Sequence, residues 1–208
     1  MRGFLRDDGR KGIRNIVAAA YLVECAHHVG KEIVARFPGQ DIHLIGFPGC
    51  FPNAYAQKVM ERLCTHPNVG AVLLLSLGCE SFNKPVLAEA VRGSGRPVKT
   101  LTIQDTGGTR STVAAGRDWV AAQLAALAGQ FSVPMRLEEL VVGTICGGSD
   151  GTSGLTGNPA RHPVLLTALR QGSKPARCVT SWKAPSRAVQ DGRSAQIKTG
   201  EKRCPPTS

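Results

Sequence analysis

The chain has 208 residues, of which 42% are hydrophobic, and a formal net charge of +11 at pH 7. This length suits one domain of ordinary size, with or without a tail, and the apolar content is enough for a core. Apolar runs such as 69–77 are far shorter than the roughly 20 residues of a membrane-spanning helix, and no signal peptide opens the chain. We therefore expect a cytoplasmic protein without a membrane partner.

The positive charge is concentrated toward the C-terminal end. Residues 1–159 contain 16 Lys/Arg against 13 Asp/Glu, whereas residues 160–208 contain 10 against 2. Residues 1–159 have no basic stripe interleaved with aromatic side chains, so we expect no nucleic-acid partner. The sequence indicates one domain over 1–159, incomplete at its C-terminal end, and a basic tail over 160–208 that is disordered or not native to the domain.

Apolar segments alternate with amphipathic ones along residues 1–159. Strands are predicted at 16–23, 42–47, 69–77, 98–103 and 140–145, and helices at 26–37, 52–64, 86–91 and 111–128. The polar, glycine-containing residues 6–15 are predicted to form a loop. This alternation predicts an α/β fold: a mostly parallel, Rossmann-like open sheet with helices on both faces, followed by an irregular C-terminal tail.

Four of the seven cysteines follow predicted strands. Cys25, Cys50, Cys79 and Cys146 come just after the first, second, third and fifth strands. Because the carboxyl ends of parallel strands lie at one edge of a sheet, where open α/β sheets bind ligands, these thiols are expected to meet there. A single cysteine at a strand end is more often a small buried hydrophobe, but three of these four adjoin glycine.

These cysteines are predicted to be reduced thiols that bind a metal. The odd number of cysteines and the absence of a signal peptide argue against disulfides. No C-x-x-C pair is present, which disfavours a zinc ribbon. Thiolates gathered from separate strands suit iron, as a ferrous ion or an iron–sulfur cluster, although another divalent metal stays open.

Several short motifs occur in a fixed order between residues 3 and 159. They are Gly3-Phe-Leu-Arg-Asp-Asp-Gly-Arg-Lys-Gly-Ile-Arg-Asn15, His66-Pro-Asn-Val69, Leu77-Gly-Cys-Glu80, Gln104 with Gly107-Gly-Thr109, Cys146-Gly-Gly-Ser-Asp150, Ser153-Gly154 and Asn158-Pro159. As an ordered set they resemble the altronate/galactarate dehydratase family. The chain departs from the family pattern around Cys50, where the usual upstream histidine and following glycine are replaced by Gly46 and Phe51, and the resemblance ends near residue 159.

The resemblance implies a lyase that dehydrates sugar acids such as altronate or galactarate to 2-keto-3-deoxy acids with iron or a similar divalent ion. In such a β-elimination a base removes the proton alpha to a carboxylate, while a metal or acid assists the leaving group. An arginine of the opening motif suits the carboxylate of the substrate. The residues expected to bind substrate are Arg10, Gln104, Gly107, Gly108, Thr109, Ser149 and Asn158, and those expected to act in catalysis are Arg14, Asn15, Glu80 and Asp150.

Other functions stay open alongside the hydro-lyase. The family also includes sulfolactate sulfo-lyases, so sulfite is an alternative leaving group. An iron-binding module or an inactive fragment without lyase activity is a further alternative. Some family members begin with a small N-terminal domain, whereas here the opening motif starts at Gly3 and leaves no room for one. We therefore expect a separate small subunit as a candidate partner, and a second copy of the chain is another candidate.

Overall fold

The computed structural model describes residues 1–136 and 139–140, and the chain forms one compact unit as far as Glu139. In chain order the elements are β1 (Arg2–Leu5), β2 (Lys11–Gly12), β3 (Ile16–Tyr21), a 3₁₀ helix (Glu24–Ala26), α1 (His27–Val34), β4 (Ile42–Gly46), α2 (Ala54–Cys64), β5 (Val69–Ser76), α3 (Lys84–Gly93), β6 (Val98–Thr102), α4 (Thr109–Ala128) and β7 (Val133–Pro134). No helix in this part of the chain has the length and apolar character needed to cross a membrane. The predicted tail, 160–208, and most of the predicted strand 140–145 lie outside the described residues.

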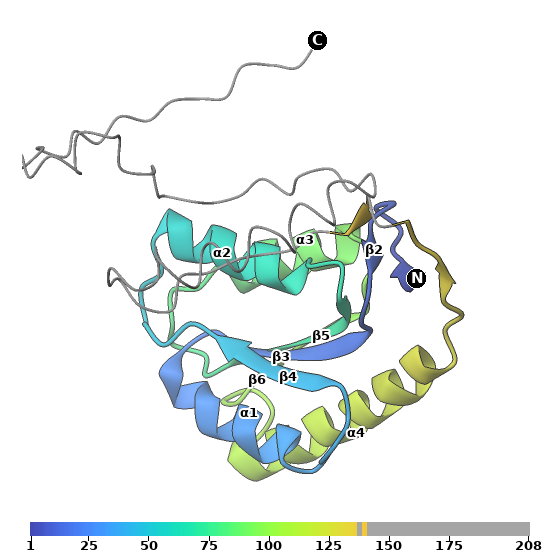
Figure 1. Ribbon diagram of the computed structural model, residues 1–208. Helices are drawn as coiled ribbons and strands as arrows, with labels where there is room; N and C mark the ends of the chain where they lie inside the picture. Colours follow the sequence, from blue (N-terminus) through green and yellow to red (C-terminus); the bar gives the residue numbers. More distant parts are fainter. Residues whose placement is uncertain (137–138, 141–208) are drawn as a thin grey trace, which may run out of the picture. The chain divides into compact units, whose positions relative to one another are not determined.

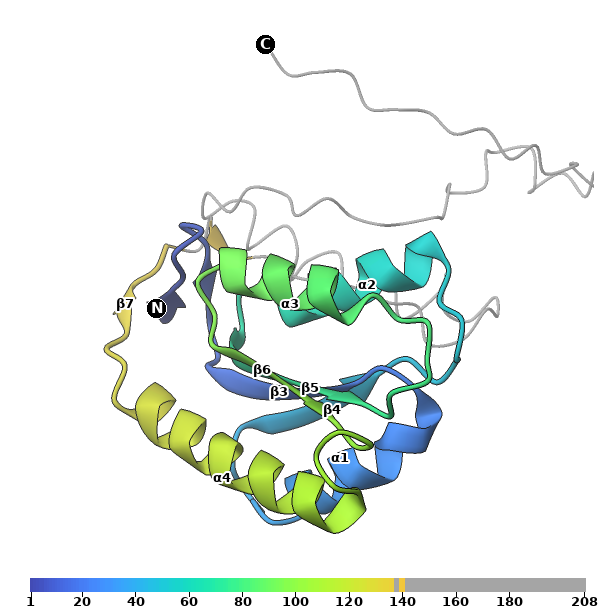
Figure 2. The same ribbon diagram turned by 180° about the vertical axis from the view of Figure 1, so that it is seen from behind.

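The main sheet has four parallel strands in the order β4-β3-β5-β6. Val17 of β3 lies opposite Ile42 of β4 on one side and Ala71 of β5 on the other. Helices α1 and α4 cover one face, and α2 and α3 cover the other (Figure 1). The view from behind shows α3 over β6, the edge strand that lies toward the viewer (Figure 2). The predicted α/β class, with a parallel sheet between two helical layers, is confirmed.

Strand β5 supplies side chains to both layers of the core. All eight of its residues are buried. Leu73 and Leu75 belong to the cluster beneath α1 and α4, whereas Val72 and Leu74 belong to the cluster beneath α2 and α3. This alternation follows from the two-residue period of a strand, and burial on both faces explains why the segment is continuously apolar.

Helices α1 and α4 approach closely because one of the contact positions is a glycine. A Cβ atom at Gly116 of α4 would lie 2.4 Å from Cδ1 of Ile33 in α1. Ile33 is fully buried in the same core cluster. A larger residue at position 116 would therefore require the buried side chain of Ile33 to move.

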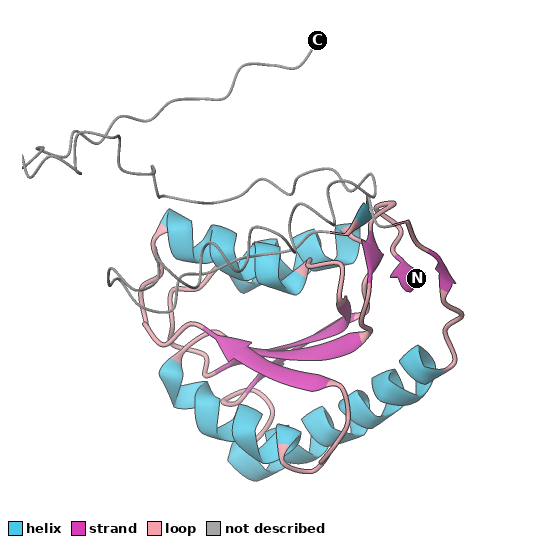
Figure 3. Cartoon of the chain, in the orientation of Figure 1, coloured by secondary structure: helices cyan, strands magenta, loops and turns pink. Residues whose placement is uncertain are grey.

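A small antiparallel sheet, β2-β1-β7, corrects the prediction that residues 6–15 form only a loop. Phe4 pairs with Gly12 across β1 and β2, and Gly3 pairs with Val133 across β1 and β7. These short strands stand apart from the main sheet (Figure 3). The sequence did not reveal them because two-residue strands are too short for a period-two pattern and β7 is about 130 residues from its partner.

Shortening Leu73 to alanine is expected to lower the free energy of unfolding by about 2–5 kcal/mol, because it leaves a cavity against β3 and the α1/α4 layer. Leu63→Ala is the matched control, since Leu63 on α2 is 41% exposed. That variant should lose less than about 1 kcal/mol. Urea unfolding followed by circular dichroism compares the two, and equal losses would contradict the central place of Leu73 in the core.

Candidate functional site

The loops at the carboxyl ends of the parallel strands form the candidate site. From β3 the chain moves to β4 on one side, and from β5 it moves to β6 on the other. The point between β3 and β5 is therefore a topological switch point, where open α/β sheets place their ligands. Cys25 follows β3, Cys50 follows β4 and Cys79 follows β5, as predicted. All three are exposed, free thiols.

Main-chain hydrogen bonds connect the three cysteine loops. The amide of Glu24 donates to the carbonyl of Pro48 (3.3 Å), and the amide of Ser81 donates to the carbonyl of Cys50 (2.9 Å). The first bond joins the loops after β3 and β4, and the second joins the loops after β4 and β5. The segments that carry the cysteines are therefore adjacent at this edge.

Thiols have the right chemistry for a soft metal, but the described part of the chain does not assemble a complete site. Within residues 1–136 and 139–140, no three His, Cys, Asp or Glu side chains are placed to hold one metal ion. The fourth predicted ligand, Cys146, lies outside the described residues. The iron centre therefore stays a prediction.

A buried polar cluster lies at the end of β5. Ser76, its last residue, is fully buried and donates from Oγ to Oε1 of Glu80, which is 7% exposed. The amide of Gly78 donates to Oε2 of the same carboxylate (2.9 Å). Lys84, the first residue of α3, donates from Nζ to Oγ of Ser76 (2.9 Å) and lies 3.7 Å from Glu80 Oε1. Both carboxylate oxygens are therefore occupied.

The surroundings of Glu80 favour its ionised form. Burial raises the pKa of this carboxyl, but the hydrogen bonds from Ser76 and Gly78, together with the Lys84 ammonium, hold the pKa below its usual range. A carboxylate with a lowered pKa is a weaker base than an ordinary one. Glu80 was predicted to act in catalysis, and its contacts are those of a group that orders the loop of Cys79.

Sequence reasoning missed Lys84, although one signal was available. A lysine in the first turn of a helix is opposed by the positive end of the helix dipole, and α3 has no acidic residue in its first turn. A residue placed against this preference indicates a partner elsewhere. Here the partners are Ser76 and Glu80.

The loop after β6 brings the predicted substrate-binding residues Gln104, Gly107, Gly108 and Thr109 to the same edge. The amide of Gln104 donates to the carbonyl of Leu77 (3.2 Å), and a Cβ atom at Gly78 would lie 2.2 Å from Oε1 of Gln104. Gly107 and Gly108 have φ values of 90° and 93°. Helix α4 begins directly after them without a side-chain cap. Amides in its first turn are thus available to an anion.

The predicted catalytic residues Arg14 and Asn15 lie at the amino ends of the parallel strands, which we call the amino edge. Arg14 forms an exposed ion pair with Asp41, just before β4. Asn15, directly before β3, donates from Nδ2 to the carbonyl of Leu127 (3.1 Å) and to Gln130 (3.0 Å). The six residues of β3 separate this edge from Cys25 by about 20 Å at about 3.3 Å per residue. The structure therefore does not bring Arg14 and Asn15 together with the cysteines.

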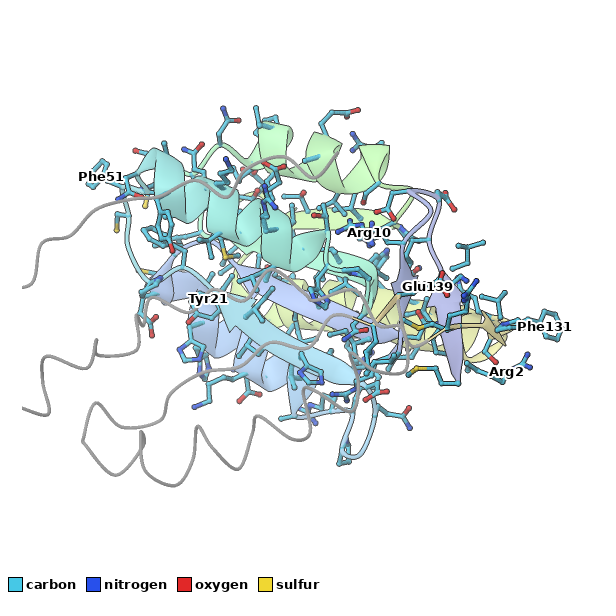
Figure 4. The ribbon with its side chains drawn as sticks, turned by 45° about the horizontal axis from the view of Figure 1, so that its top comes forward. Arg2, Arg10, Tyr21, Phe51, Phe131 and Glu139 are labelled. Carbon is cyan, nitrogen blue, oxygen red and sulfur yellow. The ribbon has the colours of Figure 1, made fainter. Side chains whose placement is uncertain are left out.

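Arg10, predicted to bind substrate, also lies at the amino edge. Its guanidinium donates to Oδ2 of Asp8 and to the carbonyl of Thr65, both at 2.7 Å. Thr65 directly follows α2, whereas Phe51 precedes that helix. Figure 4 accordingly shows Arg10 and Phe51 at opposite ends of α2. Contacts made by Arg10 therefore join the opening motif to the segment before β5.

Two buried arginines join Asp8 and Arg10 in a cluster that we call the amino-edge node. Arg96, 3% exposed, donates to the carbonyl of Val69 (3.0 Å) and to Oδ2 of Asp8 (3.3 Å). Arg6, 6% exposed, donates to the carbonyl of Pro67 (2.7 Å). Burial, followed by the nearby Arg96, lowers the pKa of Arg6 to about 10. The opening motif and the residues before β5 are thus joined by arginines that donate to main-chain carbonyls.

The remaining predicted site residues lie outside the described part of the chain. They are Cys146, Ser149, Asp150 and Asn158. Their predicted roles therefore stay predictions, including that of Asp150 in catalysis.

Comparison with known families decides the assignment of the fold and its motifs. The family described as "D-galactarate dehydratase/Altronate hydrolase, second domain" matches residues 3–128. The chain belongs to the galactarate/altronate dehydratase family. A second family description, "D-galactarate/Altronate dehydratase, C-terminal", matches residues 137–175 and so extends past residue 159, where the predicted resemblance ended.

Curated relatives of this dehydratase-family chain are considerably longer. It is 28% identical over 171 residues to altronate dehydratases of Bacillus subtilis and Escherichia coli, matching 76% and 75% of the chain and 34% of each relative. It is 27% identical over 179 residues to the (2R)-sulfolactate sulfo-lyase subunit beta of Chromohalobacter salexigens, matching 82% of the chain and 44% of that subunit. The chain thus spans about a third of the length of the altronate dehydratases.

At the amino-edge node, Asp8 is expected to give a pH-dependent contribution to stability. The hydrogen bond from Arg10, opposed by burial and aided by Arg96, lowers the pKa of Asp8 from 3.8 to about 2. The contribution is therefore fully present above about pH 4 and lost as the pH falls toward about 2. Asp8→Asn should cost about 1 kcal/mol at pH 6, since the pair is partly solvated, and the difference from wild type should shrink toward pH 2.

Urea unfolding at pH 6, 4 and 2.5 measures this difference. Asp118→Asn is the control, because Asp118 pairs with Arg117 on the exposed surface of α4. A difference for Asp8→Asn that stays constant over this pH range would show that the carboxylate does not contribute through its charge.

Proposed function

We propose that this chain carries the ligand-binding sheet edge of a hydro-lyase that dehydrates a sugar acid, such as altronate or galactarate, to a 2-keto-3-deoxy acid. The observation that carries the proposal is the family match over residues 3–128, which includes all four loops at the carboxyl edge. The topological switch point also lies at this edge, and open α/β sheets bind their ligands at such points. The altronate dehydratases are about three times as long as the region that this chain matches. We therefore propose, and do not take from the match, that the chain takes part in the dehydratase reaction.

The groups at this edge suit a polyhydroxy acid. Amides in the first turn of α4, at the positive end of a 20-residue helix, favour a carboxylate. The Gln104 side chain, beside Gly78, can bond a hydroxyl through its donors or its acceptor. Gly107 and Gly108, which have no side chains themselves, directly precede these amides and so let a ligand come close to the main chain. Held by these groups, the acid would expose the C–H bond on the carbon alpha to its carboxylate to a base.

Iron is the proposed cofactor, with ligands drawn from Cys25, Cys50, Cys79 and Cys146. Such an ion would supply Lewis-acid assistance to the departing hydroxyl. Three of these thiols lie on adjacent loops at the carboxyl edge. Since no three-ligand group forms within the described residues, the proposed ligand set depends on Cys146.

A sulfo-lyase is the second candidate, and one comparison favours it. The sulfolactate sulfo-lyase subunit beta matches a larger share of this chain, 82%, than either altronate dehydratase does. Elimination of sulfite needs the same removal of a proton alpha to a carboxylate. That relative is named as one subunit of an enzyme, which supports our proposal of a separate small companion subunit.

Substrate binding at the carboxyl edge predicts a specific effect of Gln104→Ala. The chain, alone and with a companion subunit from its host, is assayed for 2-keto acids with altronate, galactarate and sulfolactate. Loss of hydrogen bonds from Gln104 should lower kcat/KM at least about 10-fold. Gln40→Ala is the matched control, because Gln40 is exposed in the loop before β4 at the amino edge.

The same assay decides between the two edges and the two leaving groups. A loss of activity in Arg14→Lys, with Gln104→Ala unaffected, would move the substrate to the amino edge and contradict the proposal. Sulfite released from sulfolactate, without product from the sugar acids, would select the sulfo-lyase. No product from any acid, with or without the companion, would leave an iron-binding module or an inactive fragment.

Iron binding predicts a loss of metal in Cys79→Ser. Protein purified without oxygen should contain iron, measured by elemental analysis, and replacing the soft thiolate with a hydroxyl should reduce the iron content at least about 10-fold. Ser81→Ala is the control, because the exposed Ser81 contacts the Cys50 loop through its main chain. Equal iron in both variants would remove Cys79 from the ligand set.

A further inference from the structure

The buried cluster of Ser76, Glu80 and Lys84 has no role in the binding of substrate described above. Ser76 has no exposed surface, and the side chain of Glu80 is fully buried, whereas that of Lys84 is 25% exposed. Polar groups buried to this degree are costly unless they are paired with each other. Each member has a partner, so the cluster is a complete network at the carboxyl end of the central strand.

Helix α3 gains little from a lysine at its first residue. The cap of this helix is Asn83, whose Oδ1 accepts from the amide of Val86 (3.2 Å), and Pro85 follows Lys84. A positive charge in the first turn opposes the helix dipole. The contacts of Lys84 instead go back to Ser76 and Glu80, outside the helix. Lys84 therefore acts on the turn before α3 rather than on α3.

The network acts on the turn through Gly78. This glycine has a φ of 131°, which other residues rarely adopt, and its amide points to Oε2 of Glu80. A Cβ at the same position would meet the side chain of Gln104. The shape of the turn thus sets both the position of Cys79, the next residue, and the space available to Gln104.

We propose that Lys84 and Ser76 are positioning residues: they hold the Glu80 carboxylate against the Gly78 amide and so fix the turn of residues 77–80 that presents Cys79 and supports Gln104. Ser76 transmits the effect, because its hydroxyl accepts from Lys84 and donates to Glu80. The shape of the turn follows from the geometry alone, and the effect on turnover rests on the proposed lyase function.

Amide hydrogen exchange of Gly78 in the full chain tests the network at a single neutral pH. Lys84→Met keeps the length of the side chain but removes its charge, and should accelerate exchange of this amide at least about 10-fold. Lys84→Arg retains a donor and a positive charge, and should restore most of the protection. Lys58→Met, on the exposed surface of α2, is the control and should leave Gly78 unchanged. Exchange in Lys84→Met equal to that in the control would overturn the proposal.

A second measurement separates positioning from a merely structural role and from failure of the proposed function. If wild type forms a 2-keto acid, Lys84→Met should lower kcat/KM at least about 10-fold at a temperature where urea unfolding shows it to be fully folded, whereas Lys84→Arg should keep most of the activity. Faster exchange with unchanged kinetics would overturn the positioning role. If wild type forms no product, the proposed lyase function fails, and the alkylation rate of Cys79 by iodoacetamide decides instead: the proposal expects it to change in Lys84→Met and to recover in Lys84→Arg.

Discussion

Burial of β5 on both faces is the constraint on which the rest of this unit depends. Its side chains reach alternately into the two layers of core, so neither pair of helices can pack without it. The strand also pairs with β3 and β6, and its carboxyl end therefore opens at the centre of the sheet edge. A rigid strand at this point holds the turn of residues 77–80 and, through it, the neighbouring loops.

The two edges of the sheet use charge in different ways. At the amino edge, Arg6 and Arg96 are buried and donate to main-chain carbonyls, an arrangement that favours arginine because its planar guanidinium offers several donors in fixed directions. At the carboxyl edge, glycines and exposed thiols leave main-chain amides and sulfur atoms accessible. The arginines of the amino edge therefore hold segments of the main chain together, whereas the carboxyl edge is accessible to a ligand.

The family motifs within the described residues divide between these two edges. The motif of residues 3–15 and the motif of residues 66–69 meet at the amino edge, where Asn68 Oδ1 accepts from the amide of Ile13 (2.9 Å). Residues 77–80 and 104–109 meet at the carboxyl edge. One set of motifs therefore stabilises the fold, and the other supplies the candidate site.

The main sheet could be predicted from the sequence because its elements carry strong local patterns. The predicted strand 69–77 corresponds to β5, Val69–Ser76, and the predicted helix 52–64 corresponds to α2, Ala54–Cys64. Helix α4 begins at Thr109 rather than at residue 111, because the paired glycines with positive φ end immediately before it. Apolar periodicity reports burial along one element, and it does so well in a two-layered core.

The candidate site was predicted less completely, for two physical reasons. Arg10 was assigned to substrate binding and Arg14 to catalysis from the chemistry of their side chains, but both precede β3 and lie at its amino end. Strand direction, which the sequence already implied, separates them from cysteines that follow strands. Lys84 was missed because its partners, Ser76 and Glu80, depend on a turn whose shape is set by Gly78.

Pairing of β1 with β7 brings the entry and the exit of the unit side by side. Arg2 lies opposite Pro134, and the amide of Met135 donates to the carbonyl of Met1 (3.0 Å). A fold whose two ends meet at one small seam can be carried as a cassette between other segments of a longer polypeptide without disturbing its interior. Exchange of such cassettes offers a route by which polypeptides of different overall length share one α/β sheet.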